Sequence, residues 1–225
     1  MIKYIIFDLD GTLSNTLDDL HNSVCHALSE AGLPTCEKAD TRRFLGNGVK
    51  NLIFKCVENV APDATHEVKE QVLDSFRNYY VQHSLDKTAP YDGIMDMLCE
   101  CKRQGIITAI VSNKLDSAVK DIHRMFFTDF INIAIGETPE VRRKPAPDMV
   151  NEAIRLLSIQ KHCIINANEC IYVGDSEVDI ETAHNSGLPC IAVSWGFRDR
   201  EYLEKYGAET IIDHPSELMD IIQSM

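Results

Sequence analysis

Residues 2–13 of the chain read IKYIIFDLDGTL, and this stretch decides the fold. Its opening part, IKYIIF, is a short apolar run rich in β-branched and aromatic side chains, which is typical of a buried strand. The run ends at Asp8, and Asp10, Gly11 and Thr12 follow. Because ligands of an open parallel sheet bind outside the carboxyl ends of its strands, such a strand would place two carboxylates where a ligand binds.

The residues from 15 to 85 have a different pattern, with apolar side chains at helical spacing and no convincing strand. The apolar stripes lie at 17–31, 49–60 and 68–83. Thr16 and Asp19 have the spacing of a capping box at the start of the first stripe. We therefore predict an inserted, four-helix-like α-helical domain at 15–85.

After Pro90 the pattern alternates between strand and helix. The predicted strands lie at 106–111, 131–135, 170–174, 190–193 and, more weakly, 210–212. The predicted helices lie at 93–104, 116–126, 147–158, 177–186 and 216–222. Such alternation is typical of right-handed crossovers and a parallel sheet covered on both faces. The predicted fold class is α/β, with a doubly wound, mainly parallel core formed by 1–14 and 86–225.

The composition limits the partners that the chain can have. Its formal net charge is −13, and a surface of that sign repels nucleic acid and anionic lipid, so we expect neither partner. No apolar run approaches the roughly 18 residues that span a bilayer. The apolar start, from Met1 to Phe7, is too short for the core of a secretory signal. We expect a cytoplasmic protein that is a monomer or a weak homodimer.

The cysteines and histidines show no familiar metal motif. No cysteine pair has the C-x-x-C spacing of zinc sites, and no histidine pair has H-x-x-x-H spacing. We interpret the eight cysteines as reduced, mostly buried thiols, with a redox or metal role as the alternative. We assign the histidines no function.

Acidic and hydroxyl side chains follow three of the predicted strands. Asp8 and Asp10 come after the first strand, Ser112 after the second, and Asp175 after the strand at 170–174, with Asp179 one helical turn later. At one edge of a sheet these carboxylates would repel each other unless a cation lay among them. Their hard oxygen ligands favour Mg²⁺ over zinc or copper.

The same edge offers groups that suit a phosphoryl substrate. Gly11 lacks a side chain and would let backbone N–H groups approach phosphate oxygens, while Ser112 offers a hydroxyl and Lys144 a compact positive charge. The chemistry that we expect is attack by a carboxylate on phosphorus, which gives an acyl phosphate that water then hydrolyses.

Together these segments resemble the haloacid dehalogenase superfamily, on its phosphatase side, over essentially the whole chain. The four matching motifs are DLDGTL at 8–13, VSNK at 111–114, Lys144 in KPAPD at 144–148, and GDSEVD at 174–179. The resemblance implies that Asp8 is the nucleophile and a Mg²⁺ ligand. Asp10 would act as the acid and then the base, with its backbone carbonyl on the metal.

The resemblance also implies roles for the other motif residues. Thr12 would hold the first loop, and Ser112 with Asn113 would bind the phosphoryl group. Lys144 would neutralise the charge of the phosphoryl group and of the nucleophile. Asp175 would ligate Mg²⁺, and Asp179 would support the residues that bind the metal without binding it directly. Taken alone, Asp179 could also simply cap its helix.

Within the superfamily the chain resembles phosphoglycolate phosphatase-like proteins, which carry a helical cap after the first strand. Residues 44–48, FLGNG, resemble their cap loop, so Gly46 and Gly48 are candidate substrate contacts, although they could only build a turn. Such relatives commonly have an acid shortly after the first motif, where this chain has Asn15. That departure leaves the catalytic set intact and puts a close substrate assignment in doubt.

The expected activity is Mg²⁺-dependent hydrolysis of the phosphomonoester of a small soluble metabolite. One rival on the same scaffold is a sugar phosphomutase, which would return the phosphoryl group to a sugar hydroxyl. Inorganic pyrophosphate or a nucleotide monophosphate is a further candidate substrate. A rival from another class is a phosphate-binding module without catalysis, which would ordinarily have lost Asp8 or Asp10.

Overall fold

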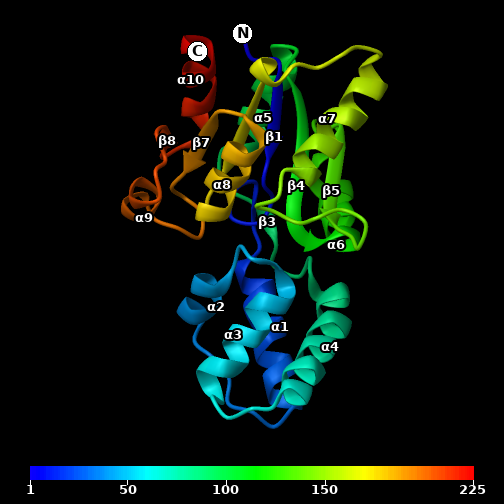
Figure 1. The fold of residues 1–225 in the computed structure, drawn as a ribbon, viewed down its shortest axis with the longest axis vertical. Helices are drawn as coiled ribbons and strands as arrows, with labels where there is room; N and C mark the ends of the chain where they lie inside the picture. The colour runs from blue at the N-terminus through cyan, green and yellow to red at the C-terminus, as the bar shows by residue number, and fades with distance from the viewer. The chain divides into compact units, whose positions relative to one another are not determined.

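A computed structural model describes all residues from 1 to 225. The chain divides into two compact units, an α/β unit formed by 1–14 with 90–225 and a helical unit formed by 15–89. Figure 1 shows the parallel sheet with its flanking helices in the first unit and only helices in the second. The predicted fold class, a parallel α/β core interrupted by a helical insert, is confirmed.

The α/β unit contains a six-stranded sheet in the order β5-β4-β1-β6-β7-β8, and every neighbouring pair is parallel. Its strands are β1 (Tyr4–Phe7), β4 (Ile107–Leu115), β5 (Ile133–Glu137), β6 (Cys170–Gly174), β7 (Cys190–Val193) and β8 (Ile211–Ile212). The chain adds β4 and β5 on one side of β1 and then β6, β7 and β8 on the other. The carboxyl end of β1 is therefore the switch point at which such sheets bind ligands.

Helices cover both faces of this sheet. Side chains alternate between the faces along a strand, and all four residues of β1 are buried. On one face, side chains of α7 and α8 form a core with Tyr4 and Ile6. The helical segments are α5 (Ile94–Arg103), α6 (Asp116–Ile122), η1 (His123–Phe127), α7 (Asp148–Lys161), η2 (Ala167–Glu169), α8 (Glu177–Ser186), α9 (Arg200–Lys205), η3 (Pro215–Glu217) and α10 (Leu218–Ser224).

The helical unit contains four helices whose apolar stripes form its core. They are α1 (Leu17–Glu30), α2 (Lys38–Phe44), α3 (Gly48–Val60) and α4 (His66–His83). The two-residue strands β2 (Ser14–Asn15) and β3 (Ala89–Pro90) pair where the chain passes between the units. No helix in the chain is both long and apolar enough to cross a bilayer.

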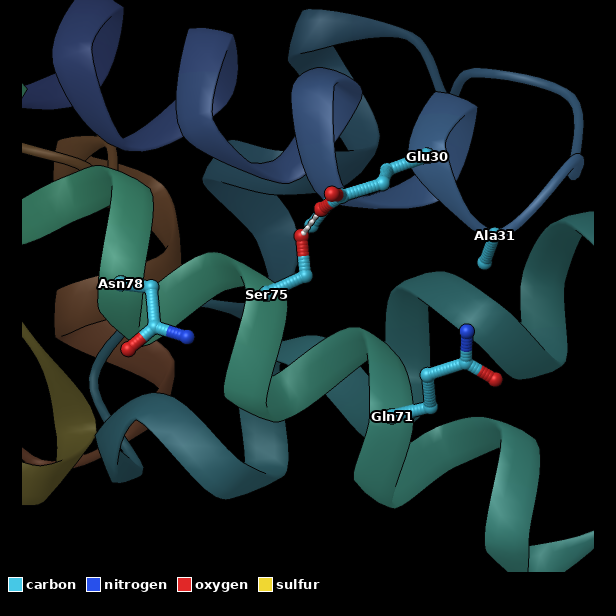
Figure 2. A pocket seen from close by; sticks show the side chains of 6 residues that line it. Glu30, Ala31, Gln71, Ser75 and Asn78 are labelled. Carbon is cyan, nitrogen blue, oxygen red and sulfur yellow. Dashed lines mark hydrogen bonds between the residues drawn. The ribbon is translucent and has the colours of Figure 1, made fainter.

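A pocket of about 260 Å³ lies between α1 and α4 in the helical unit. It is lined by Ala27, Glu30, Ala31, Gln71, Ser75 and Asn78. Figure 2 shows the Ser75 hydroxyl donating to the Glu30 carboxylate across the gap between the two helices. This polar contact joins α1 to α4 at their solvent-facing side.

The capping box predicted at Thr16 and Asp19 is wrong. The Thr16 side chain makes no cap hydrogen bond to α1. The buried Asp19 carboxylate instead accepts from the backbone N–H groups of Lys87 and Thr88, at 2.8–3.0 Å, and from the Thr88 hydroxyl at 2.8 Å. These bonds keep residues 86–89 with the helical unit, whereas the sequence placed the boundary at 85/86.

Candidate active site

Three carboxylates from distant parts of the chain meet at the carboxyl edge of the sheet. Asp8 follows β1, Asp175 follows β6, and Asp179 lies in the first turn of α8. Each offers an oxygen that lies within 4.8 Å of the others, and all three side chains are buried. The grouping that the strand ends predicted is therefore present.

Lys144 provides the positive charge of this cluster. Its buried Nζ lies 2.8 Å from an oxygen of Asp8 and 2.8 Å from an oxygen of Asp179. Burial alone would lower the pKa of Lys144, but the carboxylates of Asp179 and Asp8 outweigh it and raise the pKa above its ordinary value. The lysine therefore stays charged between the two acids.

Asp179 holds Lys144 and has little capacity left for a ligand. One of its oxygens accepts from Lys144 Nζ and, at 2.9 Å, from the Tyr172 hydroxyl. The other accepts from the backbone N–H of Ser176 at 3.1 Å and from its hydroxyl at 2.6 Å. A Cβ at Gly174 would lie 2.3 Å from the Asp179 carboxyl carbon, so glycine is required there. This geometry fits the supporting role that the resemblance implied.

Asp175 is fixed by the two loops that flank it. The backbone N–H of Phe197 donates to one oxygen at 2.6 Å, and the Thr12 hydroxyl donates to the other at 3.3 Å. A Cβ at Gly11 or at Gly196 would lie 2.4 Å from an Asp175 oxygen. Gly11 also has a φ of +90°, which side chains rarely adopt. Both glycines therefore leave room for this carboxylate.

The loop after β1 is a tight turn around one carbonyl. The N–H groups of Leu13 and Ser14 both donate to the Leu9 carbonyl, at 3.1 and 3.0 Å, and the N–H of Gly11 donates to Ser14 at 2.9 Å. The indole N–H of Trp195 closes the loop from outside by donating to the Thr12 carbonyl at 3.0 Å. These hydrogen bonds hold the backbone of the loop in one conformation and so fix the direction in which Asp8 and Asp10 project.

The cluster carries more negative charge than its lysine balances. Burial, opposed by Lys144 and reinforced by the other acids, raises the pKa of Asp8 to about 7. Burial and the neighbouring Asp179 and Asp8 raise the pKa of Asp175 well above its ordinary value. Lys144 is one positive charge among three carboxylates, and the hard oxygen donors of Asp8 and Asp175 fit Mg²⁺.

Asp10 has a partner that sequence reasoning did not assign. The buried Lys114 Nζ donates to an Asp10 oxygen at 2.9 Å, while the Asp10 side chain stays partly exposed. Lys114 belongs to the second motif but was given no role, although its place after Ser112 and Asn113 at a strand end was a usable signal. This pair holds a second carboxylate beside Asp8 in a fixed position.

The second motif lies inside β4, which runs to Leu115 where the sequence predicted an end at Val111. The strand shifts register between these two residues. The Ser112 hydroxyl accepts from the backbone N–H of Lys114 at 3.3 Å. Both polar atoms of the Asn113 side chain bond to the main chain of Lys144, at 2.8 and 3.0 Å, so Asn113 positions the lysine. The phosphate contacts of Ser112 and Asn113 stay predictions.

Gly46 and Gly48 belong to the helical unit, where Gly46 lies in the turn between α2 and α3 and Gly48 is the first residue of α3. Their φ angles are +108° and +79°, which explains why glycine occurs twice in this turn. Their predicted contact with substrate stays a prediction. Tyr172 is a further site residue that the sequence did not reveal, because a tyrosine in a buried strand looks like core.

Comparison with known proteins agrees with this site. The family model described as haloacid dehalogenase-like hydrolase matches residues 5–193. A phosphoglycolate phosphatase of Mesorhizobium japonicum is 31% identical over 213 residues, which cover 93% of this chain and 90% of that protein. The pyrophosphatase PpaX of Bacillus cereus is 28% identical over 225 residues, covering 100% of this chain and 98% of that protein.

A solved structure matches equally well. The crystal structure of a protein provisionally named phosphoglycolate phosphatase, from Lactobacillus delbrueckii subsp. bulgaricus, has a TM-score of 0.89 at 33% identity, and the match covers 98% of both chains. The chain therefore belongs to the haloacid dehalogenase-like hydrolase family, as its motifs indicated. Within that family it is an enzyme of the phosphatase class.

Proposed function

We propose that the chain is a Mg²⁺-dependent phosphatase that hydrolyses phosphomonoesters of small metabolites of the phosphoglycolate type through a phosphoaspartate on Asp8. The observation that carries the proposal is the position of Asp8. Its carboxylate lies at the switch point of the sheet, 2.8 Å from the Lys144 ammonium and beside Asp175. A nucleophile for phosphorus needs a fixed carboxylate next to positive charge, and this group has both.

In the first step, an Asp8 oxygen forms a bond to phosphorus as the bond from phosphorus to the leaving oxygen breaks. Asp10 in its acid form donates a proton to that oxygen, so the product leaves as a neutral alcohol. Lys114 holds Asp10 on the same side of the site for this transfer. Lys144 balances the charge that Asp8 and the phosphoryl group bring together.

In the second step, Asp10 accepts a proton from water as the water oxygen bonds to phosphorus. The acyl phosphate bond breaks, Asp8 becomes a carboxylate again, and inorganic phosphate leaves. Mg²⁺ bound by Asp8 and Asp175 would supply positive charge that orients the phosphoryl oxygens. The Asp179 carboxylate accepts a hydrogen bond from the Lys144 ammonium and keeps it in place in both steps.

Two observations bear on the substrate. The relatives named phosphoglycolate phosphatase support a small phosphorylated acid as substrate. The relatives named pyrophosphatase PpaX, which match all of this chain, make inorganic pyrophosphate the second candidate. The turn with Gly46 and Gly48 resembles the cap loop of phosphoglycolate phosphatase-like proteins, and it is our candidate for discrimination between the two.

The test is phosphate release from a panel that contains 2-phosphoglycolate, pyrophosphate, a nucleotide monophosphate and a sugar phosphate, with Mg²⁺ or with chelator. We expect release that requires Mg²⁺ and disappears in Asp8→Asn, and a phosphoryl adduct on Asp8 by mass spectrometry after rapid quench. Asp220→Asn, an exposed substitution on α10, is the matched control and keeps activity. Full activity of Asp8→Asn would overturn the mechanism, and isomerisation of the sugar phosphate without phosphate release would favour the phosphomutase.

A further inference from the structure

A second cluster of metal-binding side chains lies within the helical unit and contains sulfur and nitrogen donors. It consists of His21 and Cys25, one turn apart on α1, and Cys36, in the segment just before α2. One donor atom from each lies within 4.8 Å of the other two. The Cys25 sulfur is 3.6 Å from His21 Nε2.

These separations are close to those of a bound metal. Zinc bonds are about 2.3 Å to sulfur and 2.0–2.1 Å to nitrogen, so adjacent donors of a tetrahedral site lie roughly 3.5–3.8 Å apart. Cys25 and His21 already have that separation. Closing Cys36 onto them requires movement only within a segment that belongs to neither helix.

The surroundings orient the donors as a metal site does. His21 Nδ1 lies 3.0 Å from the hydroxyl of the buried Thr41, and the Cys25 sulfur lies 3.7 Å from Nδ1 and 3.6 Å from Nε2 of the same ring. Metal-bound histidines commonly have their other nitrogen held in this way. The same hydroxyl lies 3.4 Å from the Cys36 sulfur, so Thr41 fixes two of the three donors.

We propose that His21, Cys25 and Cys36 bind a Zn²⁺-class metal ion, which fastens the segment before α2 to α1. On binding, each thiol loses its proton to solvent and its sulfur bonds to the ion, while the neutral imidazole binds through Nε2. Cys25 and His21 are half-buried and give the ion access from solvent, whereas Cys36 is buried. Soft donors distinguish this site from the oxygen cluster of the α/β unit, which suits Mg²⁺.

The experiment uses the full chain, reduced, with Mg²⁺ in excess so that the oxygen cluster is filled. Co²⁺ is the spectroscopic probe, because only thiolate ligands give a charge-transfer band in the near ultraviolet, and Zn²⁺ is then added to displace it. We expect one thiolate-bound ion per chain, and loss of the band in Cys25→Ser and in Cys36→Ser. Cys99→Ser, at an exposed thiol outside the cluster, keeps the band. Thr41→Val is expected to weaken binding about tenfold.

A second measurement guards against variants that fail to fold. In the unmodified chain, Zn²⁺ should protect Cys25 and Cys36 from alkylation while Cys99 reacts, and a chelator should remove that protection. Absence of the band, a band that survives in Cys25→Ser/Cys36→Ser, or equal alkylation of all three thiols with and without Zn²⁺ would overturn the proposal. Protection of the half-buried Cys25 that persists after chelation would overturn it as well.

Discussion

Replacing Asp8, the proposed nucleophile, with Asn should remove activity and, without a divalent cation, stabilise the protein. Burial, only partly offset by Lys144, raises the pKa of Asp8 from 3.8 to about 7. Well above pH 7 the native state must hold this group ionised at an unfavourable site. One pKa unit corresponds to about 1.4 kcal/mol, so the difference between 3.8 and about 7 means that ionising Asp8 costs the native state roughly 4 kcal/mol. Asn has nearly the same shape and no charge, so it avoids the cost.

The pH dependence of this effect has a definite sign. Below pH 3.8 both the native and the unfolded state carry the proton, so Asp8 resembles Asn and the two proteins should be equally stable. Between pH 3.8 and about 7 only the native state retains the proton, so the free energy of unfolding of the unsubstituted chain falls as pH rises. The advantage of Asp8→Asn should be about 1–2 kcal/mol at pH 5 and about 4 kcal/mol at pH 8.

Urea unfolding in chelator at pH 5 and pH 8 measures this difference. Trp195 is the only tryptophan and lies in the α/β unit, so its fluorescence reports the unit that contains Asp8. Asp220→Asn, at an exposed position of α10, should show no such gain at either pH. Saturating Mg²⁺ should shrink the gap, because the cation binds the ionised native site. An equal gap at both pH values, or an Asn variant less stable at pH 8, would refute the reasoning.

Three further substitutions test the supports of the site. Tyr172→Phe removes the hydroxyl that donates to Asp179, which should cost about 1.5–3 kcal/mol in urea unfolding and lower kcat more than it raises KM. Gly11→Ala places a Cβ 2.4 Å from an Asp175 oxygen, so Mg²⁺ titration of activity should show weakened metal binding. Asp19→Ala leaves buried N–H groups without an acceptor and should destabilise the helical unit by about 2–4 kcal/mol, measured by helical circular dichroism. Unchanged parameters in any of the three would contradict the corresponding contact.

Parts of the fold were predictable because their ends are marked locally. The strands predicted at 170–174 and 190–193 have those bounds in the structure, since Glu169 and Asp175 bound the first apolar run, and Pro189 and Ser194 bound the second. The strand predicted at 131–135 instead lies at Ile133–Glu137. There the apolar run begins before the pairing with β4 does, and periodicity alone cannot locate the first hydrogen-bonded residue.

Other features depend on partners that are distant in the chain. Asp19 has the spacing of a helix cap, but its stronger partners lie 68 and 69 residues away, and local spacing holds no information about them. Tyr172 likewise looks like core until the fold brings Lys144 and Asp179 to its hydroxyl. In contrast, Asp8 and Asp175 were predictable as neighbours, because the carboxyl ends of parallel strands share one edge of the sheet.

The net negative charge of the site explains why so many hydrogen bonds hold its side chains in place before a ligand binds. Three buried carboxylates face one lysine in the cluster of Asp8, Asp175, Asp179 and Lys144, so without a cation the cluster is electrically unbalanced. Asp179 accepts hydrogen bonds from Lys144 and Ser176. The pKa values of Asp8 and Asp175 are raised by their burial and by the neighbouring acids. A proton and the proposed Mg²⁺ would therefore compete for the carboxylates of Asp8 and Asp175. The arrangement that makes Asp8 costly to ionise alone is thus the one that makes a cation beside it favourable.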